Sequence, residues 1–268
     1  VTVLEREAQV GGCLQTFRRG AALFDTGFHY VGALGEGESL HTLFSYFDLI
    51  SLPWKKLDED CFDEVVIGED TFAFANKHQR FYERMSARFP KEREGLKKYV
   101  DFLKQVGDHI FDSFNLQNEG TFTNSLFARS AYEFLNETIK DPLLRKVLSG
   151  TSLKMELNAP TLPLYTFAQI NDSFIRSAWR LRGGGMQIAD KLVGGIEAMG
   201  GEVKTRSIVT YIKEEDGKVV GVTINDEDYL EADWIISSTH PAYTVSLVGD
   251  SKKMRRIYRD RIAKLDNT

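Results

Sequence analysis

The sequence predicts an α/β protein in which both ends of the chain form one domain and the middle forms a second, inserted domain. Three observations lead to this prediction. The chain opens on a short apolar run that ends in an acid, its middle combines helical periodicity with short alternating runs, and its last part returns to strands. We assign residues 1–50 and 181–268 to the first domain and residues 51–180 to the inserted α+β domain. The end of the chain is expected to begin a further segment of the inserted domain.

The first residues predict a strand with a ligand-binding tip. Residues 1–4 are an apolar run typical of a buried parallel strand, and Glu5 follows at its carboxyl end. In dinucleotide-binding folds, an acid at this position of the second strand accepts hydrogen bonds from the adenosine ribose hydroxyls. In the loop over residues 8–20, Gly11 and Gly12 lack a Cβ and let the backbone pass close to a ligand, for which a pyrophosphate is expected.

The next segments change from helical to strand-like patterns. A short strand is expected over residues 21–25, and apolar residues at helical spacing predict a helix over residues 38–49. Short apolar runs separated by turn residues then predict an antiparallel sheet that begins the inserted domain. Its expected strands are residues 62–67, 71–75 and 80–82.

Helices are expected to fill the rest of the inserted domain. Residues 90–110 carry one apolar stripe opposite a charged face, and shorter helices are predicted over residues 124–139, 142–149 and 163–175. This region is rich in aromatic residues, which either pack the helices, line a tunnel for a long apolar substrate or dock on a membrane surface. They are Phe111, Phe114, Phe122, Phe127, Phe134, Tyr165, Phe167 and Phe174.

The last third is expected to return to strands. Residues 180–185 read as a break whose three glycines precede a helix over residues 186–199. Turns at Asp216-Gly217 and Asn225-Asp226 predict a three-stranded meander. A further apolar strand over residues 234–238 would end in small hydroxyl residues, where an open α/β sheet receives its ligand.

Composition excludes several classes of function. A net charge of −5, with basic residues interspersed among acids, argues against a nucleic-acid partner. Cys13 and Cys61 are the only cysteines and form no metal-binding pattern, so we expect buried thiols in a reducing compartment. No apolar run approaches the roughly 20 residues that span a bilayer. A cytoplasmic protein is expected, with peripheral membrane contact left open.

Several motifs resemble those of a known flavoprotein group. They are VLER at residues 3–6, GGC at 11–13, TF at 16–17 and FDTGFHYVG at 24–32. These segments resemble the flavin-binding region of the phytoene desaturase, carotenoid isomerase and retinol saturase group. The FDTGxHYxG form, with Cys13 after the glycine pair, is most similar to the retinol saturase branch.

The resemblance implies a Rossmann-type FAD-binding domain of the glutathione-reductase type, and redox or isomerisation chemistry on carbon–carbon double bonds of a long apolar polyene or lipid. The flavin ring would take or give a hydride, so no side chain has to act as a nucleophile. His29 is the implied catalytic residue. The implied FAD-binding residues are Glu5, Arg6, Gly11, Gly12, Thr16, Asp25, Gly27, Val209 and Thr239.

Two of these residues carry a second interpretation. His29 either lines the substrate channel as a proton donor or is a histidine satisfied by a backbone carbonyl beside the core. Asp25 either contributes to the cofactor site or fixes its turn through hydrogen bonds from its side chain to the backbone.

The resemblance also implies a chain that opens with a glycine-rich βα unit. This sequence does not contain such a unit. We therefore expect that a piece of roughly 25 to 30 residues precedes Val1. Two other functions share a similar fold and stay open: a flavin amine oxidase-like enzyme, and a non-catalytic escort module that binds prenylated or lipid partners, as GDP dissociation inhibitors do. The sequence leaves the oligomeric state undetermined.

Overall fold

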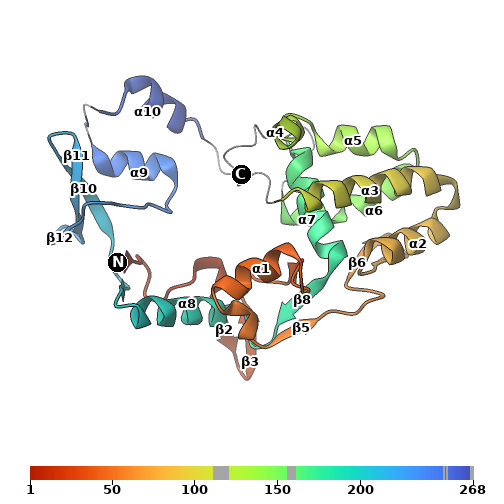
Figure 1. Cartoon of the computed structure of the whole chain (residues 1–268), viewed down its shortest axis with the longest axis horizontal. Helices are drawn as coiled ribbons and strands as arrows, with labels where there is room; N and C mark the ends of the chain where they lie inside the picture. The colour runs from red at the N-terminus through yellow and green to blue at the C-terminus, as the bar shows by residue number, and fades with distance from the viewer. Residues whose placement is uncertain (111–120, 156–160, 250, 252, 266–268) are drawn as a thin grey trace. The chain divides into compact units, whose positions relative to one another are not determined.

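The computed structural model describes residues 1–110, 121–155, 161–249, 251 and 253–265. The chain divides into two compact units, which we call the terminal unit (Val1–Thr26 with Gly185–Thr268) and the inserted unit (Gly27–Gly184) (Figure 1). This confirms the predicted α/β architecture, in which a part built from both chain ends is interrupted by an inserted part. Residues 27–50 lie in the inserted unit, because β4 (Val31–Gly32) pairs with β8 (Ala178–Leu181).

A parallel strand pair organises the terminal unit. β1 (Thr2–Leu4) pairs in parallel with β9 (Glu202–Lys204), with Val3 opposite Val203. The parallel direction agrees with the prediction, but the expected burial does not, because Val3 is 37% exposed. β9 is the only strand hydrogen-bonded to β1 among the described residues, so one edge of β1 stays open.

The loop after β1 contains structure that the sequence analysis missed. A 3-10 turn, η1 (Gly12–Leu14), leads into a hairpin of β2 (Thr16–Arg19) and β3 (Ala22–Asp25), with Thr16 opposite Asp25. β3 agrees with the strand expected over residues 21–25, whereas β2 replaces predicted loop. Cys13 is exposed rather than buried, because η1 lies at the surface.

The meander forms as predicted. Its three antiparallel strands are β10 (Val209–Glu215), β11 (Lys218–Ile224) and β12 (Asp228–Glu231). The Asp216-Gly217 and Asn225-Asp226 turns have positive φ at both residues, at 51° and 77° and at 54° and 61°. This backbone matches the twist of the flanking strands, which is why turns of this composition close hairpins.

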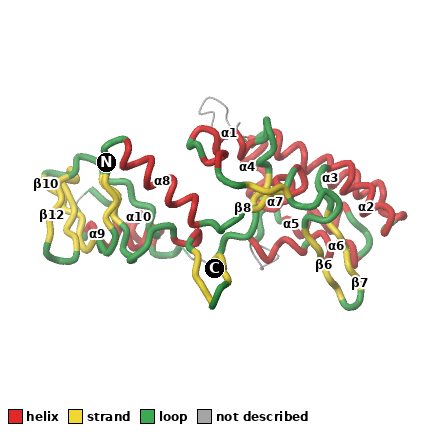
Figure 2. The backbone as a smooth tube through the Cα atoms, turned by 90° about the horizontal axis from the view of Figure 1, so that it is seen from below, coloured by secondary structure: helices red, strands yellow, loops and turns green. Residues whose placement is uncertain are grey.

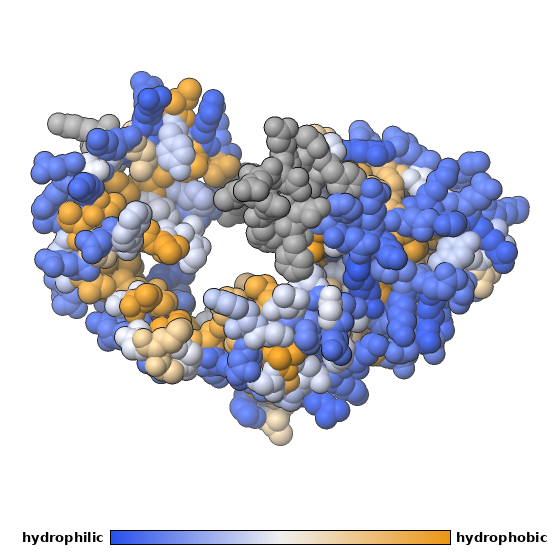
Figure 3. All heavy atoms as spheres, in the orientation of Figure 1, coloured by the Kyte–Doolittle hydropathy of each residue, from blue (hydrophilic) through white to orange (hydrophobic). Residues whose placement is uncertain are grey.

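Helix α8 (Met186–Ala198) confirms the helix predicted over residues 186–199 and precedes β9 in the chain. Two further helices, α9 (Pro241–Val248) and α10 (Arg256–Ile262), follow the meander. Ile212, Val222, Ile224 and Leu247 form the small apolar core between the meander and α9. In the space-filling view, hydrophobic residues remain visible around these elements (Figure 3).

The predicted strand over residues 234–238 is wrong. This segment is irregular, and Trp234 and Ile236 are 90% and 97% exposed. Ile235, by contrast, packs against the small core. An apolar run becomes a strand only when another strand satisfies its backbone groups, and no described strand pairs with this segment.

Helices dominate the inserted unit (Figure 1). α3 (Arg93–Asp108) packs against α7 (Leu164–Arg176), and shorter helices accompany this pair in the described part of the unit. These are α2 (His78–Arg88), α4 (Thr121–Phe127), α5 (Ala131–Thr138) and α6 (Pro142–Leu148). The single helix expected over residues 124–139 is two helices, because the Ser130 side chain accepts the Tyr132 N–H and caps α5.

The strands of the inserted unit confirm one prediction and correct another. β6 (Asp63–Ile67) and β7 (Asp70–Phe74) form the expected antiparallel hairpin, which extends from the helices (Figure 2). The third predicted strand, over residues 80–82, lies in α2 instead. Phe81 and Met85, which are 0% and 1% exposed, are one helical turn apart and enter the core together.

A second small sheet was not predicted. β8 lies between β4 and β5 (Trp54–Lys56), and all pairs are antiparallel. The break expected over residues 180–185 is therefore wrong for Arg180 and Leu181, which belong to β8. Helix α1 (Ser39–Tyr46) follows β4 within the range expected for it.

Among the described residues, short 3-10 helices connect these elements. They are η2 (Leu49–Ser51), η3 (Pro90–Glu92) and η5 (Gly150–Lys154). None of the described helices has the length and apolar character needed to cross a membrane.

Most of the predicted aromatic residues whose side chains are described pack the helices of the inserted unit. Phe134 and Phe167 are buried, whereas Phe127 is 51% exposed. Phe111, Phe114 and the side chain of Phe122 lie outside the described residues.

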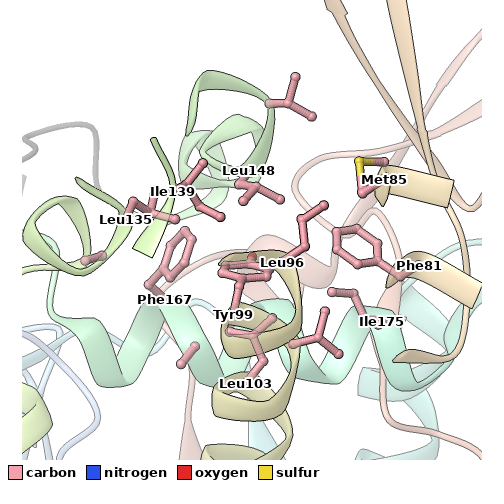
Figure 4. Close-up of a cluster of buried hydrophobic side chains, with 14 of the residues drawn as sticks. Phe81, Met85, Leu96, Tyr99, Leu103, Leu135, Ile139, Leu148, Phe167 and Ile175 are labelled. Carbon is pink, nitrogen blue, oxygen red and sulfur yellow. The ribbon is translucent and has the colours of Figure 1, made fainter. Parts of the chain in front are cut away.

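Tyr99 lies at the centre of the core, near Leu96, Leu103 and Phe167 (Figure 4). It is 1% exposed, and burial raises the pKa of its phenol well above the ordinary value near 10. Because the folded state holds this proton more tightly than the unfolded chain, Tyr99 should cost stability as pH rises above about 10 and cost nothing below that pH. We predict that Tyr99→Phe makes the alkaline decline in unfolding free energy shallower, as measured by urea unfolding between pH 8 and 11. Parallel pH curves for the two proteins would contradict this assignment.

Candidate functional site

Glu5 lies where the sequence analysis expected it, directly after the parallel strand β1. Its N–H donates to the Lys204 carbonyl at 2.8 Å, which extends the pairing with β9 by one residue. One carboxylate oxygen, Oε1, accepts the N–H of Glu7 at 2.7 Å, and the side chain is half-buried. The second carboxylate oxygen has no partner among the described residues and can accept a ligand hydroxyl.

The two glycines of the following loop have different surroundings. Gly11 has φ 104°, and a Cβ there would lie 3.1 Å from the Cβ of Ala189 on α8. Gly12 has φ 50° with open space around the position of its missing Cβ. Gly11 therefore lets the loop lie close to α8, whereas Gly12 leaves its backbone accessible to a ligand.

The hairpin after this loop brings Thr16 and Asp25 together. They are opposite each other in β2 and β3, and the Asp25 Oδ1 accepts the N–H of Gly185 at 2.7 Å. Gly185 is the N-cap of α8, so the carboxylate lies at the positive end of that helix. This contact supports the structural interpretation of Asp25. The Thr16 hydroxyl has no hydrogen-bond partner among the described residues.

Val209 and Thr239 belong to the part of the terminal unit that includes the meander and α9. Val209 packs against the small core together with Leu4, the residue before Glu5, and its carbonyl accepts the Tyr243 hydroxyl at 3.4 Å. Thr239 lines a cavity of about 220 Å³ beside α9. Its hydroxyl lies 2.8 Å from that of Thr244.

The remaining predicted residues are less enclosed. Arg6 is exposed and pairs with Glu7 at 2.8 Å. Gly27 and His29 open the inserted unit, and both are exposed. The His29 carbonyl accepts Arg180 Nη1 at 2.7 Å, whereas its imidazole has no partner among the described residues. The histidine is therefore not one satisfied within the core.

The sequence matches the family of flavin-containing amine oxidoreductases over residues 1–259. The chain belongs to this family. It is 28% identical to all-trans-retinol 13,14-reductase of Danio rerio, over 88% of this chain and 43% of that protein, and 26% identical to the Rattus norvegicus protein of that name, over 84% and 40%. It thus spans less than half the length of these relatives. An oxidoreductase from Methanosarcina mazei has a similar fold, with a TM-score of 0.66 at 19% identity over 99% of this chain and 60% of that one.

The chain belongs to the flavin-containing amine oxidoreductases, and several residues after β1 have the groups that a flavin nucleotide requires. Glu5 offers an unused acceptor at the end of a parallel strand, and Gly12 has an open left-handed backbone that a Cβ would strain. The Thr16 hydroxyl, which has no partner among the described residues, belongs to the same loop-and-hairpin segment. These residues fit a flavin nucleotide.

Sequence reasoning missed residues that shape the loop after β1 and the hydroxyl cluster beside α9. The Gln15 amide donates to the carbonyls of Gln9 at 2.7 Å and Val10 at 3.3 Å, which closes the loop on itself. The hydroxyls of Ser237, Thr239 and Thr244 form a cluster. The Ser237 oxygen lies 2.9 Å from that of Thr239 and 2.7 Å from that of Thr244. A lone glutamine gives no sequence signal, whereas the run of small hydroxyl residues after position 236 was visible.

Proposed function

We propose that the protein is an FAD-dependent oxidoreductase that acts on carbon–carbon double bonds of a long apolar polyene or related lipid, such as a carotenoid or retinoid. Membership of a flavin oxidoreductase family and similarity to retinol reductases support this proposal. The main support for FAD binding is the Glu5 carboxylate, which lies at the end of a parallel strand. One of its oxygens has no hydrogen-bond partner among the described residues.

When bound, the flavin supplies hydride transfer, and the chain has to bind and orient it. Glu5 would hold the adenosine ribose, and the Gly12 backbone would admit the pyrophosphate. In this proposal Arg6, Thr16, Gly27, Val209 and Thr239 add contacts around the cofactor. The exposed imidazole of His29 is proposed to donate a proton to the substrate.

We expect the full-length protein to be yellow with bound FAD, and Glu5→Ala in that protein to weaken FAD binding about 10- to 100-fold through loss of a charge-assisted hydrogen bond. Flavin fluorescence titration measures the affinity. Glu202→Ala is the matched control, because Glu202 lies at the opposite end of the same strand pair and pairs with Lys204 at 3.3 Å. Equal FAD affinity in Glu5→Ala and the control would remove Glu5 from the site.

Amine oxidation is the second candidate, since the matched family carries that activity in its name. Under this alternative, added amines would be oxidised with release of hydrogen peroxide, and polyenes would be left unchanged. A colourless protein that binds a prenylated partner would instead favour the escort function.

A further inference from the structure

Tyr30, Asp63 and Lys154 form a hydrogen-bonded group in the inserted unit, which we call the polar cluster. The Tyr30 hydroxyl donates to Asp63 Oδ2 at 2.5 Å, and Lys154 Nζ donates to the same oxygen at 2.9 Å. Lys154 also donates to the Tyr30 hydroxyl. The three residues come from separate segments, because Tyr30 precedes β4, Asp63 begins β6 and Lys154 ends η5.

Aromatic rings surround the polar cluster. The Tyr30 ring lies 4.7 Å from that of Phe174 and 6.2 Å from that of Phe62. Lys154 Nζ lies 4.1 Å from the centre of the Tyr30 ring and 5.1 Å from that of Phe174. The ammonium is therefore held over two ring faces, which favours a cation there. The side chains of Lys154 and Asp63 are each 31% exposed, so a ligand can reach them.

Contacts of neighbouring residues anchor the segment that carries Lys154. In η5, the buried Thr151 donates its hydroxyl to Asn171 Oδ1 on α7 at 2.8 Å. Met155, the next residue after Lys154, packs against the core of the inserted unit. A binding group held by packing and hydrogen bonds loses little conformational entropy when it takes a ligand.

The polar cluster has unused hydrogen-bonding capacity. An ammonium has three donors, and Lys154 uses two of them among the described residues. Burial and the hydrogen bond to Asp63 raise the pKa of Tyr30 well above its ordinary value, so the phenol stays neutral. The charges of Lys154 and Asp63 balance. A neutral ligand hydroxyl can accept the remaining N–H of Lys154, whereas the Asp63 carboxylate would repel an anionic head group.

We propose that the polar cluster binds the hydroxyl end of a long apolar alcohol, with Lys154 as the donor to the ligand oxygen. This inference rests on the proposed function and names the head group of that same substrate. The aromatic rings would contact the adjoining hydrocarbon.

The test compares two probes, all-trans-retinol and the hydrocarbon in which a methyl group replaces the terminal CH₂OH group of retinol. Quenching of the intrinsic fluorescence of the flavin-loaded protein measures the binding of each. We expect the unaltered protein to bind the alcohol about 10-fold more tightly than the hydrocarbon. Lys154→Met should bring the two affinities within about twofold of each other and leave hydrocarbon binding unchanged. Lys97→Met is the control, because Lys97 is exposed in the same unit and pairs with Asp101.

An undiminished alcohol preference in Lys154→Met would overturn the proposal, as would tighter binding of the corresponding carboxylic acid than of the alcohol. Tyr30→Phe provides a second variant should Lys154→Met fail to fold, and it should lower the preference about threefold. Flavin retention and double-bond reduction are measured on the same preparations. Their absence would contradict the proposed function, whereas an altered head-group preference would still support the polar cluster.

Discussion

Replacing Asp172 with alanine is expected to lower the unfolding free energy of the inserted unit by about 3–5 kcal/mol. Asp172 is 1% exposed and joins three helices. Its Oδ1 lies 2.7 Å from His78 Nε2 on α2, and its Oδ2 lies 2.5 Å from Arg176 Nε. Arg176 in turn pairs with Asp108 of α3 at 2.6 Å. Removing the carboxylate takes one of two ion-pair partners from the partly buried Arg176 guanidinium and takes the partner of His78 as well.

Urea unfolding followed by circular dichroism measures this loss. Asp101→Ala is the matched control, because it breaks an ion pair with Lys97 at 2.7 Å in which the two side chains are 61% and 68% exposed. Solvent screens such a pair, so the control should lose no more than about 0.5 kcal/mol. Equal losses in the two variants would show that the buried network does not stabilise the unit.

Gly32→Ala is expected to lower the unfolding free energy of the inserted unit by about 3 kcal/mol. Gly32 is buried in β4, and a Cβ there would lie 2.3 Å from the carbonyl carbon of Ser173 on α7. Backbone atoms cannot move aside as a flexible side chain can, so β4 and α7 would have to separate. That separation also disturbs the Ala33 N–H, which donates to the Ser173 and Ser177 carbonyls at 2.9 Å each.

The same substitution at Gly194 provides the comparison. Gly194 lies within α8, and nothing lies within 4 Å of an added Cβ. Alanine there should raise stability by about 0.5–1 kcal/mol, because it favours the helix and meets no neighbour. A Gly32→Ala protein as stable as the unaltered chain would mean that β4 and α7 are less closely packed than the structure shows.

Local sequence patterns predicted the structure correctly wherever it depends on residues that are neighbours in the chain. Asp216-Gly217 and Asn225-Asp226 form their turns because their own backbone preferences favour positive φ. The helical spacing within residues 186–199 predicted α8, since periodicity reports which face is buried. Glu5 follows β1 as expected because an apolar run and the acid that ends it are adjacent in sequence.

Local sequence patterns predicted the wrong secondary structure where it depends on pairing or packing with residues far away in the chain. Residues 80–82 resemble a strand, yet Phe81 and Met85 reach the core only if the segment is helical. Trp234 belongs to an apolar run that has no described strand beside it. The same limit explains why β8 was missed, because its two partners, β4 and β5, are more than 120 residues earlier in the chain.

The sequence by itself determined the membership of a flavin oxidoreductase family, the place of Glu5 at the end of a parallel strand, and the meander, since these depend on residues close together in the chain. Only the tertiary structure decided that the Asp25 carboxylate accepts the N–H of Gly185 at the start of α8 and that Tyr30, Asp63 and Lys154 meet. Such groups are brought together when helices and strands bury their apolar faces, and the chain sequence carries no local record of which distant side chains that packing will join.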